Sequence, residues 1–449
     1  MMKFKRIAAH WMITGMMTAV FFSIVVASAW GKPPTYTLDA LFRLALDQSE
    51  AVKLAAETLY VAEQDKKRAL SVLIPRFSAF GEYTRYSEEK YLGETPLQPE
   101  WSTAYGLRID QSFTLNGKEL IALEVSKAAI EKERLSLAAN RETLLIRVAE
   151  AYYQVLKAEK AVDIADANMK RLQTYKDAVE TRLKLGAVTK TDLYRASAEL
   201  SGAISDQIRA ANILRLTESV LTRVAGVPRP FHLAAPDLFP DFFPQFDLAG
   251  LNREALTNRT DLRALELTQK MADDQVQYTR SAWWPQIGIE GVWARQDADP
   301  GALTPIEDRL WAKIGLQFSI FDGGLRRAEL NQSRSMNRQA ELGVSALKKQ
   351  IAVEVDEAFF DFITRKNTIT ALADQLTFAR ENLKAVTRQF DFGLANSVDV
   401  VDANTLQVAA ERRLAEAVFD SHLAVLKIER ATGQLLNNVQ TRLELKESN

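Results

Sequence analysis

The chain has 449 residues, of which 47% are apolar and 26% are charged, and its formal net charge at pH 7 is −1. This balance excludes a largely disordered chain and gives no indication of nucleic acid or a strongly charged substrate as a partner. The absence of cysteine excludes disulfides, thiolate metal sites, a cysteine nucleophile and a lipidated N-terminal cysteine.

Residues 1–29 are predicted to be a signal peptide. Three basic residues within the first six positions precede an apolar run from Trp11 to Val26, and Ala27-Ser28-Ala29 fits a cleavage site. The alternative is a retained membrane anchor, but the run contains three hydroxyl side chains and is shorter than the ~20 residues of a spanning helix. We therefore expect export across an inner membrane.

The rest of the chain alternates between helical and strand patterns. Thr37–Ile74 has the apolar spacing of an amphipathic helix, Pro75 ends it, and Lys118–Leu185 contains neither proline nor glycine. Alternating apolar and polar residues predict strands over residues 77–86, 105–113, 287–293 and 311–321. In order, the predicted segments are an N-terminal segment and helix (30–74), a β-hairpin (75–117), a helical hairpin (118–225), a proline-rich connector (226–246), a helix (247–284), a second β-hairpin (285–324), a second helical hairpin (325–432) and a C-terminal tail (433–449).

The second half of this order repeats the first. Three pairs of glycines, Gly117/Gly324, Gly186/Gly393 and Gly226/Gly433, are each separated by 207 residues. The sequence Glu150-Ala151-Tyr152-Tyr153 also corresponds to Glu357-Ala358-Phe359-Phe360. Repetition in register predicts two copies of one structural unit.

Each copy contains a helix–turn–helix of the same chemistry, LKLGAVTKTDLYRA from Leu183 and FDFGLANSVDVVDA from Phe390. The glycine is expected to end the first helix in the left-handed conformation. Asn396 followed by Asp399 is typical of an N-cap with a carboxylate in the first turn, and Thr189 and Asp192 stand at the matching positions. Each motif predicts a tight αα-hairpin.

Helix lengths predict an antiparallel shaft. The helix from residue 118 to 185 would span ~100 Å at ~1.5 Å per residue, a length that two shorter helices stacked end to end can match. We expect residues 189–225 to stack on residues 247–284, and the helix from residue 37 to stack on the one from residue 396. The connector 226–246 would then bulge near the middle of the shaft.

The strand patterns indicate a membrane barrel. On the last strand Ile314, Leu316, Phe318 and Ile320 share one face and polar residues share the other. Trp101, Trp293 and Trp311 are predicted to lie near strand ends, at the interface between lipid and water. A soluble sheet covered by helices is the alternative, but the helices are too polar to supply an apolar cover. Four strands per chain do not close a barrel, so we expect a homotrimer with twelve strands.

With these elements in order, the duplicated halves and both turn motifs resemble the TolC-type outer-membrane efflux protein family over residues 38–433. The resemblance implies a mainly α protein with a membrane β-barrel: a trimeric channel-tunnel in the outer membrane of a Gram-negative bacterium, with a long periplasmic α-helical barrel. It also implies an outer-membrane exit duct for tripartite efflux or type I secretion. Its partners would be a periplasmic adaptor protein, an inner-membrane transporter and outer-membrane lipid.

The resemblance also assigns residues at the periplasmic tip. Asp399 and Asp402 match an acidic pair that constricts the entrance in TolC, and Asp192 matches a further acidic position. Phe390 is counted with these aspartates at the constriction. Phe390 and Ala395 stand where TolC has a tyrosine and an arginine, which predicts a tip that opens more readily. The aspartates are alternatively ordinary helix-start charges. The residues expected to meet the adaptor are Gly186, Ala187, Val188, Thr189, Gly393, Leu394, Ala395 and Asn396.

Other classes fit less well. A periplasmic adaptor is also rich in helical hairpins, but it resembles one coiled-coil hairpin between β-domains rather than two equal copies with membrane-patterned strands. No nucleophile motif or phosphate-binding glycine loop is present, and His232 and His422 have no cysteine partner. We therefore expect neither an enzyme nor a bound cofactor or metal.

Overall fold

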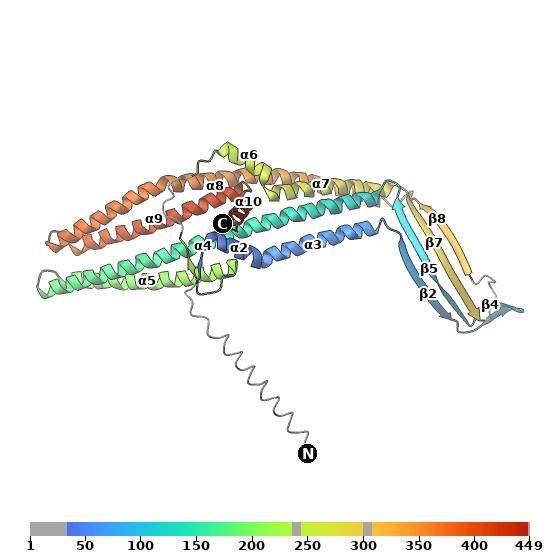
Figure 1. Ribbon diagram of the computed structural model, residues 1–449, viewed down its shortest axis with the longest axis horizontal. Helices are drawn as coiled ribbons and strands as arrows, with labels where there is room; N and C mark the ends of the chain where they lie inside the picture. The colour runs from blue at the N-terminus through green and yellow to red at the C-terminus, as the bar shows by residue number, and fades with distance from the viewer. Residues whose placement is uncertain (1–33, 236–243, 300–307, 448–449) are drawn as a thin grey trace, which may run out of the picture.

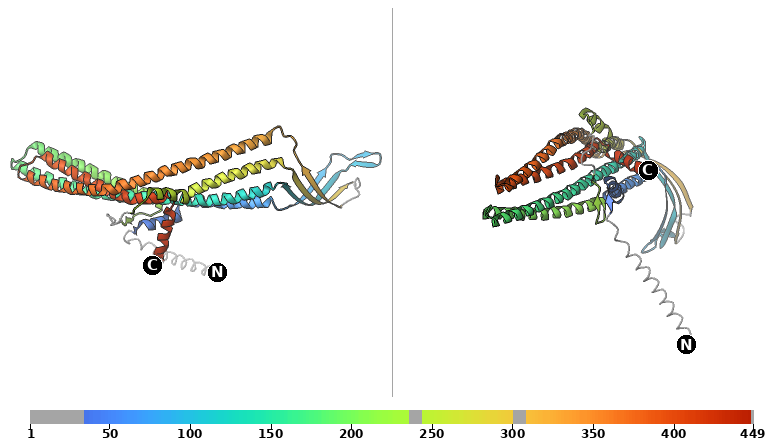
Figure 2. Two further views of the ribbon diagram at one scale, coloured as in Figure 1. Left: turned by 90° about the horizontal axis from the view of Figure 1, so that it is seen from above. Right: turned by 60° about the vertical axis from the view of Figure 1, so that its left-hand side comes forward.

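The computed structural model describes residues 34–235, 244–299 and 308–447. These form an elongated molecule in which long helices run side by side and a curved sheet extends from one end (Figure 1, Figure 2). The predicted signal peptide lies outside the described residues, as does the proline-rich centre of the connector. Among the described residues, no helix is both long enough and apolar enough to cross a membrane.

In both halves of the chain the principal elements come as two helices, two long strands and two further helices. The first half contains β1 (Thr35–Tyr36), α2 (Leu38–Gln48), α3 (Glu50–Ser71), β2 (Arg76–Arg85), β3 (Lys90–Leu92), β4 (Thr95–Gln98), β5 (Trp101–Thr114), α4 (Lys118–Lys184), α5 (Lys190–Ala225) and β6 (His232–Leu233). The second half contains α6 (Leu248–Asn258), α7 (Thr260–Arg280), η1 (Ser281–Trp283), β7 (Gln286–Asp299), β8 (Asp308–Gln317), α8 (Leu325–Asp391), α9 (Ser397–Ala431) and α10 (Leu435–Glu447). The two long helices, α4 and α8, have 67 residues each.

Two predicted helices are each broken into a short and a longer piece. The helix expected from Thr37 to Ile74 breaks at Ser49, and the one expected from residue 247 to 284 breaks at Arg259, where ψ is about 120°. Neither site contains proline or glycine, so no strong local signal marks the break. The chain changes direction at each break, so α2 is not collinear with α3, and α6 is not collinear with α7 (Figure 1).

The predicted stacking of the shorter helices was wrong. Helices α3 and α5 both pack on α4, whereas α7 and α9 both pack on α4 and α8. Gly226, at the end of α5, meets Gln48 at the α2–α3 break, and Gly433, after α9, lies against Arg259 at the α6–α7 break. Thus α5 continues into α3 and α9 into α7. The helices predicted over residues 37–74 and 247–284 are equally long. Length alone therefore could not show which of them stacks on α5 and which on α9.

The joint at Gly433 requires glycine for two reasons. Its φ is +71°, which side chains with a Cβ rarely adopt. A Cβ at this position would also lie 2.9 Å from Arg259 Cα. The end of α9 is therefore fitted directly onto the start of α7.

The four-stranded sheet among the described residues is antiparallel, in the order β2-β5-β7-β8. Strands β5 and β7 are longer than predicted, and β8 ends at Gln317, so Phe318 and Ile320 lie beyond it. Between the first two predicted strands lies a further, short hairpin, β3–β4. Paired residues that face each other on adjacent strands lie on the same face, so the register defines both faces of the sheet.

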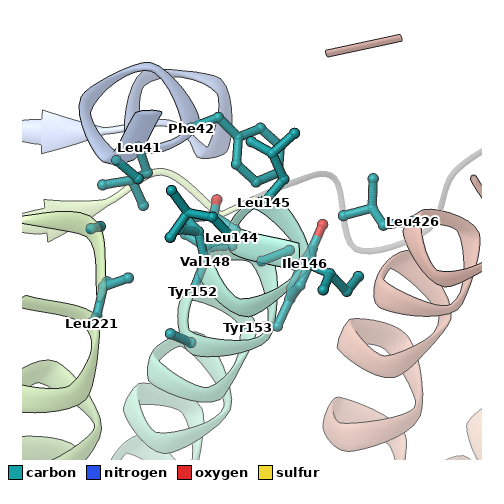
Figure 3. Close-up of a cluster of buried hydrophobic side chains, with 14 of the residues drawn as sticks. Leu41, Phe42, Leu144, Leu145, Ile146, Val148, Tyr152, Tyr153, Leu221 and Leu426 are labelled. Carbon is teal, nitrogen blue, oxygen red and sulfur yellow. The ribbon is translucent and has the colours of Figure 1, made fainter. Parts of the chain in front are cut away.

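The largest apolar core lies near the middle of the shaft (Figure 3). There Leu41 and Phe42 of α2 pack with Leu145 and Val148 of α4 and with Leu221 of α5, all fully buried. The short parallel pair of β1 and β6 lies beside this core, where Tyr152 donates a hydrogen bond to the Ala234 carbonyl.

The segment predicted as a tail contributes helix α10 to the same core. Leu435 and Val439 of α10 are fully buried. The apolar residues of this segment therefore pack into the core, although the segment was predicted only as a C-terminal tail.

Candidate functional site

Both hairpin turns have the backbone expected of them. Gly186 and Gly393 have φ values of 74° and 72°, which confirms the predicted left-handed conformation. In the first turn Ala187 N–H donates to the Arg182 carbonyl and Gly186 N–H to the Leu183 carbonyl, and the second turn has the equivalent pair. These are Schellman motifs, which satisfy the last carbonyls of α4 and α8.

The second helix of each hairpin begins with a complete capping box. The Thr189 side chain accepts from the Asp192 amide while the Asp192 carboxylate accepts from the Thr189 amide at 2.9 Å. Asn396 and Asp399 make the same reciprocal pair, also with a 2.9 Å bond to the Asn396 amide. Both aspartates therefore act as helix-start residues, whatever further role they have.

Polar contacts join the two hairpins at the tip. The Ser397 hydroxyl donates to Asp192 Oδ1 at 2.6 Å, and this bond together with those from Thr189 lowers the pKa of Asp192. Arg182 of α4 donates to the Phe390 carbonyl at 2.7 Å and to Asp391 Oδ1, also at 2.7 Å. Asp192 and Arg182 are thus inter-hairpin contacts within one chain.

Phe390 lies between the hairpins rather than at an opening. It is 5% exposed and packs with Val179, Ala196 and Val400. Its ring centroid lies 5.5 Å from that of Tyr175, and the Arg182 guanidinium lies 4.7 Å from the centroid of Phe390. The expectation that Phe390 lines the constriction is therefore corrected, because its side chain is enclosed by its own chain.

The other predicted tip residues differ in exposure. Asp399 and Asp402 are exposed one turn apart at the start of α9. Gly186, Ala187, Thr189, Gly393, Leu394 and Asn396 are exposed, whereas Val188 and Ala395 pack against the apolar cluster around Phe390. The tip therefore exposes the capping side chains and the backbone of the turn glycines. Val188 and Ala395, which were predicted to meet the adaptor, pack inside instead.

Large apolar side chains also project from the tip. Leu185, Phe392 and Leu394 are 79%, 81% and 79% exposed. Leu185 and Phe392 directly precede the turn glycines, and the glycine and cap motifs alone do not single them out. The sequence signal that could identify them is a large apolar residue at the C-terminal end of a helix, directly before the turn glycine.

The register of the sheet separates an apolar face from a polar face. Leu310, Ile314 and Leu316 of β8 face the same side as Trp293, Ile289 and Ile287 of β7. Trp101 and Trp293 belong to this face, and Trp101 stacks on Tyr83 at 6.5 Å between centroids.

Trp311 lies on the polar face, paired with Val292 and one residue along from the apolar row. The same face carries the ion pair of Arg108 with Glu290. The prediction that Trp311 is an interface aromatic is therefore corrected. Trp293 is also mid-strand rather than at a strand end, because β7 extends to Asp299.

A layer of long helices with a curved, two-faced sheet at one end and capped hairpins at the other is suited to form part of the wall of a conduit. The model of the outer membrane efflux protein family matches residues 41–227 and 251–434, so the chain belongs to that family. The resemblance identified from the turn motifs is thereby confirmed.

Individual relatives agree with this assignment. The chain is 24% identical to the outer membrane protein TolC of Vibrio cholerae over 328 residues, covering 70% of this chain and 73% of that protein. It is 24% identical to TolC of Escherichia coli K12 over 381 residues, covering 82% and 76%. The crystal structure of the outer membrane protein VceC of Vibrio cholerae superposes with a TM-score of 0.77 at 17% identity, covering 88% of this chain and 96% of that one.

The family assignment establishes the main points of function. The chain is an outer-membrane efflux protein, a transport conduit located in the outer membrane. The periplasmic adaptor considered as an alternative is thereby excluded.

Proposed function

We propose that three copies of the chain assemble into a tunnel that passes substrate from an inner-membrane transporter and a periplasmic adaptor to the exterior. The observation that carries this proposal is the four-stranded sheet, whose edge strands β2 and β8 have no further partner strand among the described residues. In lipid each unpaired backbone group costs several kcal/mol, so the edges require partners. Pairing β8 of one copy with β2 of the next closes a barrel of twelve strands around a hollow centre.

The helical shaft supports the same arrangement. Helix α8 lies along one edge, and α3 and α5 lie along the other (Figure 1). Leu342 and Phe378 on α8 are 70% and 73% exposed, and Leu54 on α3 and Leu216 on α5 are 68% and 63% exposed. Unpartnered apolar side chains on both edges favour a second copy as the occupant, because it would continue the wall that the sheet edges also require.

The two faces of the sheet fit a barrel wall. The apolar face with Ile314, Leu316 and Trp293 is suited to outer-membrane lipid, and the polar face with Arg108 and Glu290 to a water-filled lumen. The shaft then extends into the periplasm and ends at the two hairpins.

The hairpin tips are suited to dock an adaptor. Leu185, Phe392 and Leu394 supply apolar contact area around backbone that the turn glycines leave bare. In three copies these residues would form a ring at the tunnel entrance, with Asp399 and Asp402 on the adjacent helix starts.

Site-specific cross-linking tests this role. A photoreactive amino acid at Leu394 should capture an adaptor protein in native membranes, whereas the same group at Leu310, on the apolar face of the sheet, should capture none. If Leu394 captures no periplasmic or inner-membrane protein in actively exporting cells, the tip is not a docking site. Capture at Leu310 but not at Leu394 would contradict the proposed orientation.

A further inference from the structure

The last strand of the sheet ends before its sequence pattern does. The apolar alternation of β8 continues through Phe318 and Ile320, which are 50% and 87% exposed, yet β8 ends at Gln317. Gln317 pairs with Gln286, the first residue of β7, so β7 offers no partner to the residues that follow. Because β8 is an edge strand, only a strand on its free side can extend it.

The free side of β2 is complementary to that of β8. The apolar face of β2 includes Phe77, which is 69% exposed. The polar face of β2 includes Glu82 and that of β8 includes Lys313, and both charged side chains are exposed. Apolar side chains on one face and opposite charges on the other are the cross-strand partners that stabilise an antiparallel pair. These edges therefore suit a second copy of the chain as the partner.

The register within one chain limits how two copies can join. Directly opposed residues form one row across the sheet, from Arg76 of β2 to Lys313 of β8. In a closed barrel this row meets β2 of the next copy at a displaced residue, because tilted strands are staggered. The displacement is even, since an odd one would exchange the two faces. It is directed toward the end of β2, because Pro75 and α3 precede Arg76 and offer no strand.

The tilt of barrel strands leaves two displacements. With a rise of ~3.3 Å per residue and ~4.8 Å between strands, a displacement of four residues per copy tilts a twelve-stranded barrel by ~35°, and one of six residues by ~45°. Displacements of two and eight residues would give ~20° and ~55°, outside the ~35–45° of membrane barrels. Lys313 is therefore opposite either Phe80 or Glu82 of the next copy.

The polar face favours a displacement of six residues. It places the Lys313 ammonium opposite the Glu82 carboxylate, which is an opposite-charge pair. A displacement of four residues would place Lys313 opposite Phe80, whose ring centroid already lies 5.9 Å from the Arg108 guanidinium. It would also leave the Glu82 carboxylate opposite Trp311.

The apolar face and the backbone favour the same displacement. Six residues place Phe318 opposite Phe77, so that two exposed rings cover each other. Ile320 is then opposite Pro75, and the Ile320 carbonyl already accepts from Arg326 at 3.3 Å. Four residues would place Phe318 opposite Pro75, which has no amide hydrogen for the Phe318 carbonyl.

We propose that β8 of one copy pairs with β2 of the next in the register that places Lys313 opposite Glu82. Phe318 then lies opposite Phe77, and the strand continues beyond Gln317 as its sequence alternation predicts. The register rests on the trimer of the proposed function and adds the residue contacts that close it.

Disulfide cross-linking measures this register directly, because the chain has no cysteine of its own. In the proposed register Gln317 is opposite Ser78. The Tyr86 amide donates to Glu100, next to β5, so alternate residues of β2, Ser78 among them, form non-hydrogen-bonded pairs on the free side, where side chains are closest. Ser78→Cys with Gln317→Cys should therefore give a covalent trimer in oxidised outer membranes, seen on a denaturing gel without reductant.

Two further cysteine pairs report the neighbouring registers. Ser78→Cys with Gly315→Cys reports a displacement of four residues, and Ser78→Cys with Ser319→Cys reports one of eight. Each should give at least about fivefold less covalent trimer, because residues offset by two lie ~7–8 Å apart. Equal or greater cross-linking by either pair would overturn the register, as would a trimeric native mass with no cross-linking by any pair. A monomeric parent would overturn the proposed tunnel and this register with it.

A charge exchange tests the same contact without cysteine. Lys313→Glu should lower the temperature at which the trimer dissociates in detergent, and Glu82→Lys added to it should restore that temperature. Glu290, opposite Lys313 within one chain, is present in both variants, so the difference reports the contact between copies. The control is Lys313→Glu with Glu94→Lys, which restores the same net charge at the exposed β3–β4 turn and should not restore the temperature. Absent restoration by Glu82→Lys, or equal restoration by both, would overturn the proposal.

Discussion

The aspartates that cap the second helix of each hairpin occupy equivalent positions and have different surroundings. Asp192 caps α5 and also accepts a hydrogen bond from Ser397 of the other hairpin, whereas Asp399 caps α9 and remains exposed. Sequence patterning predicted both caps, because a capping box is local chemistry. The contact between Asp192 and Ser397 joins residues 205 positions apart, and no local pattern contains it.

The exposed pair Asp399 and Asp402 leads to a prediction about ion conduction. In a trimer these residues would place six carboxylates around one axis at the entrance, where mutual repulsion favours a bound multivalent cation. Asp399→Ala with Asp402→Ala should therefore reduce cation selectivity and abolish block by multivalent cations from the periplasmic side. Single-channel recording in a planar bilayer measures both.

The matched control for this experiment is Asp374→Ala, which removes an exposed carboxylate of α8 away from the start of α9. It should conduct and block as the parent does. If the double variant also keeps the parent's selectivity and block, the aspartates serve only as helix-start residues.

Glu142 of α4 gives a prediction about pH. Burial, together with the charge of Asp261, raises its pKa to about 7. Because the pKa is raised in the folded state, the protonated carboxyl makes its full contribution to folding stability below about pH 4.5, the ordinary pKa. This contribution is lost as the pH rises through about 7. Glu142→Gln should thus be more stable than the parent at pH 8 by roughly 2–3 kcal/mol and nearly equal to it at pH 4.

Thermal loss of helical circular dichroism, followed at both pH values, measures this difference. Glu131→Gln, an exposed site on the same helix, is the control and should not change the pH dependence. If the parent and the Glu142→Gln variant unfold at the same temperature at pH 8, ionisation of Glu142 does not destabilise the folded protein.

At the scale of the elements, the order of helices and strands was predictable from the sequence because each follows from periodicity and from proline and glycine positions. The long helices, the turns and most of the strands were found in this way. The breaks at Ser49 and Arg259 were not, because they depend on a tertiary fit to Gly226 and Gly433 rather than on a local signal. The same fit decides which helices stack, and helix lengths gave no information about it.

The turns give the prediction at this scale. A β-branched residue in the left-handed region costs ~1 kcal/mol or more, and a Cβ at Gly186 or Gly393 meets no neighbouring atom. Gly186→Val and Gly393→Val should therefore distort the tip locally and reduce adaptor cross-linking at Leu394. The sheet lies ~100 Å away along the helices, so assembly of the proposed barrel should be unaffected.

Gly202→Val is the control for both turn variants, because Gly202 lies within α5 with open space around it and no left-handed backbone. It should cross-link and export as the parent does. Normal export and cross-linking by both turn variants would remove the turns from the docking surface.

At the scale of the whole molecule, one chain is a segment of a wall. Its sheet has two unpaired edges, its shaft has apolar side chains along both sides, and its capped hairpins lie at the far end (Figure 1, Figure 2). The alternation on the strands predicted an apolar and a polar face. The same alternation separates Trp311 from Ile314 and Leu316, and the register confirms that Trp311 lies on the polar face.

The most direct test of the account is the native mass of the purified protein together with its attachment to the membrane. The account predicts a detergent-stable complex with three times the mass of the mature chain, which stays in the outer-membrane fraction after an alkaline wash. Leu342→Asp, on the α8 edge, should lower the proportion of this complex relative to Leu185→Asp, an exposed residue at the hairpin tip away from that edge. A monodisperse monomer released from the membrane by the wash would contradict the account.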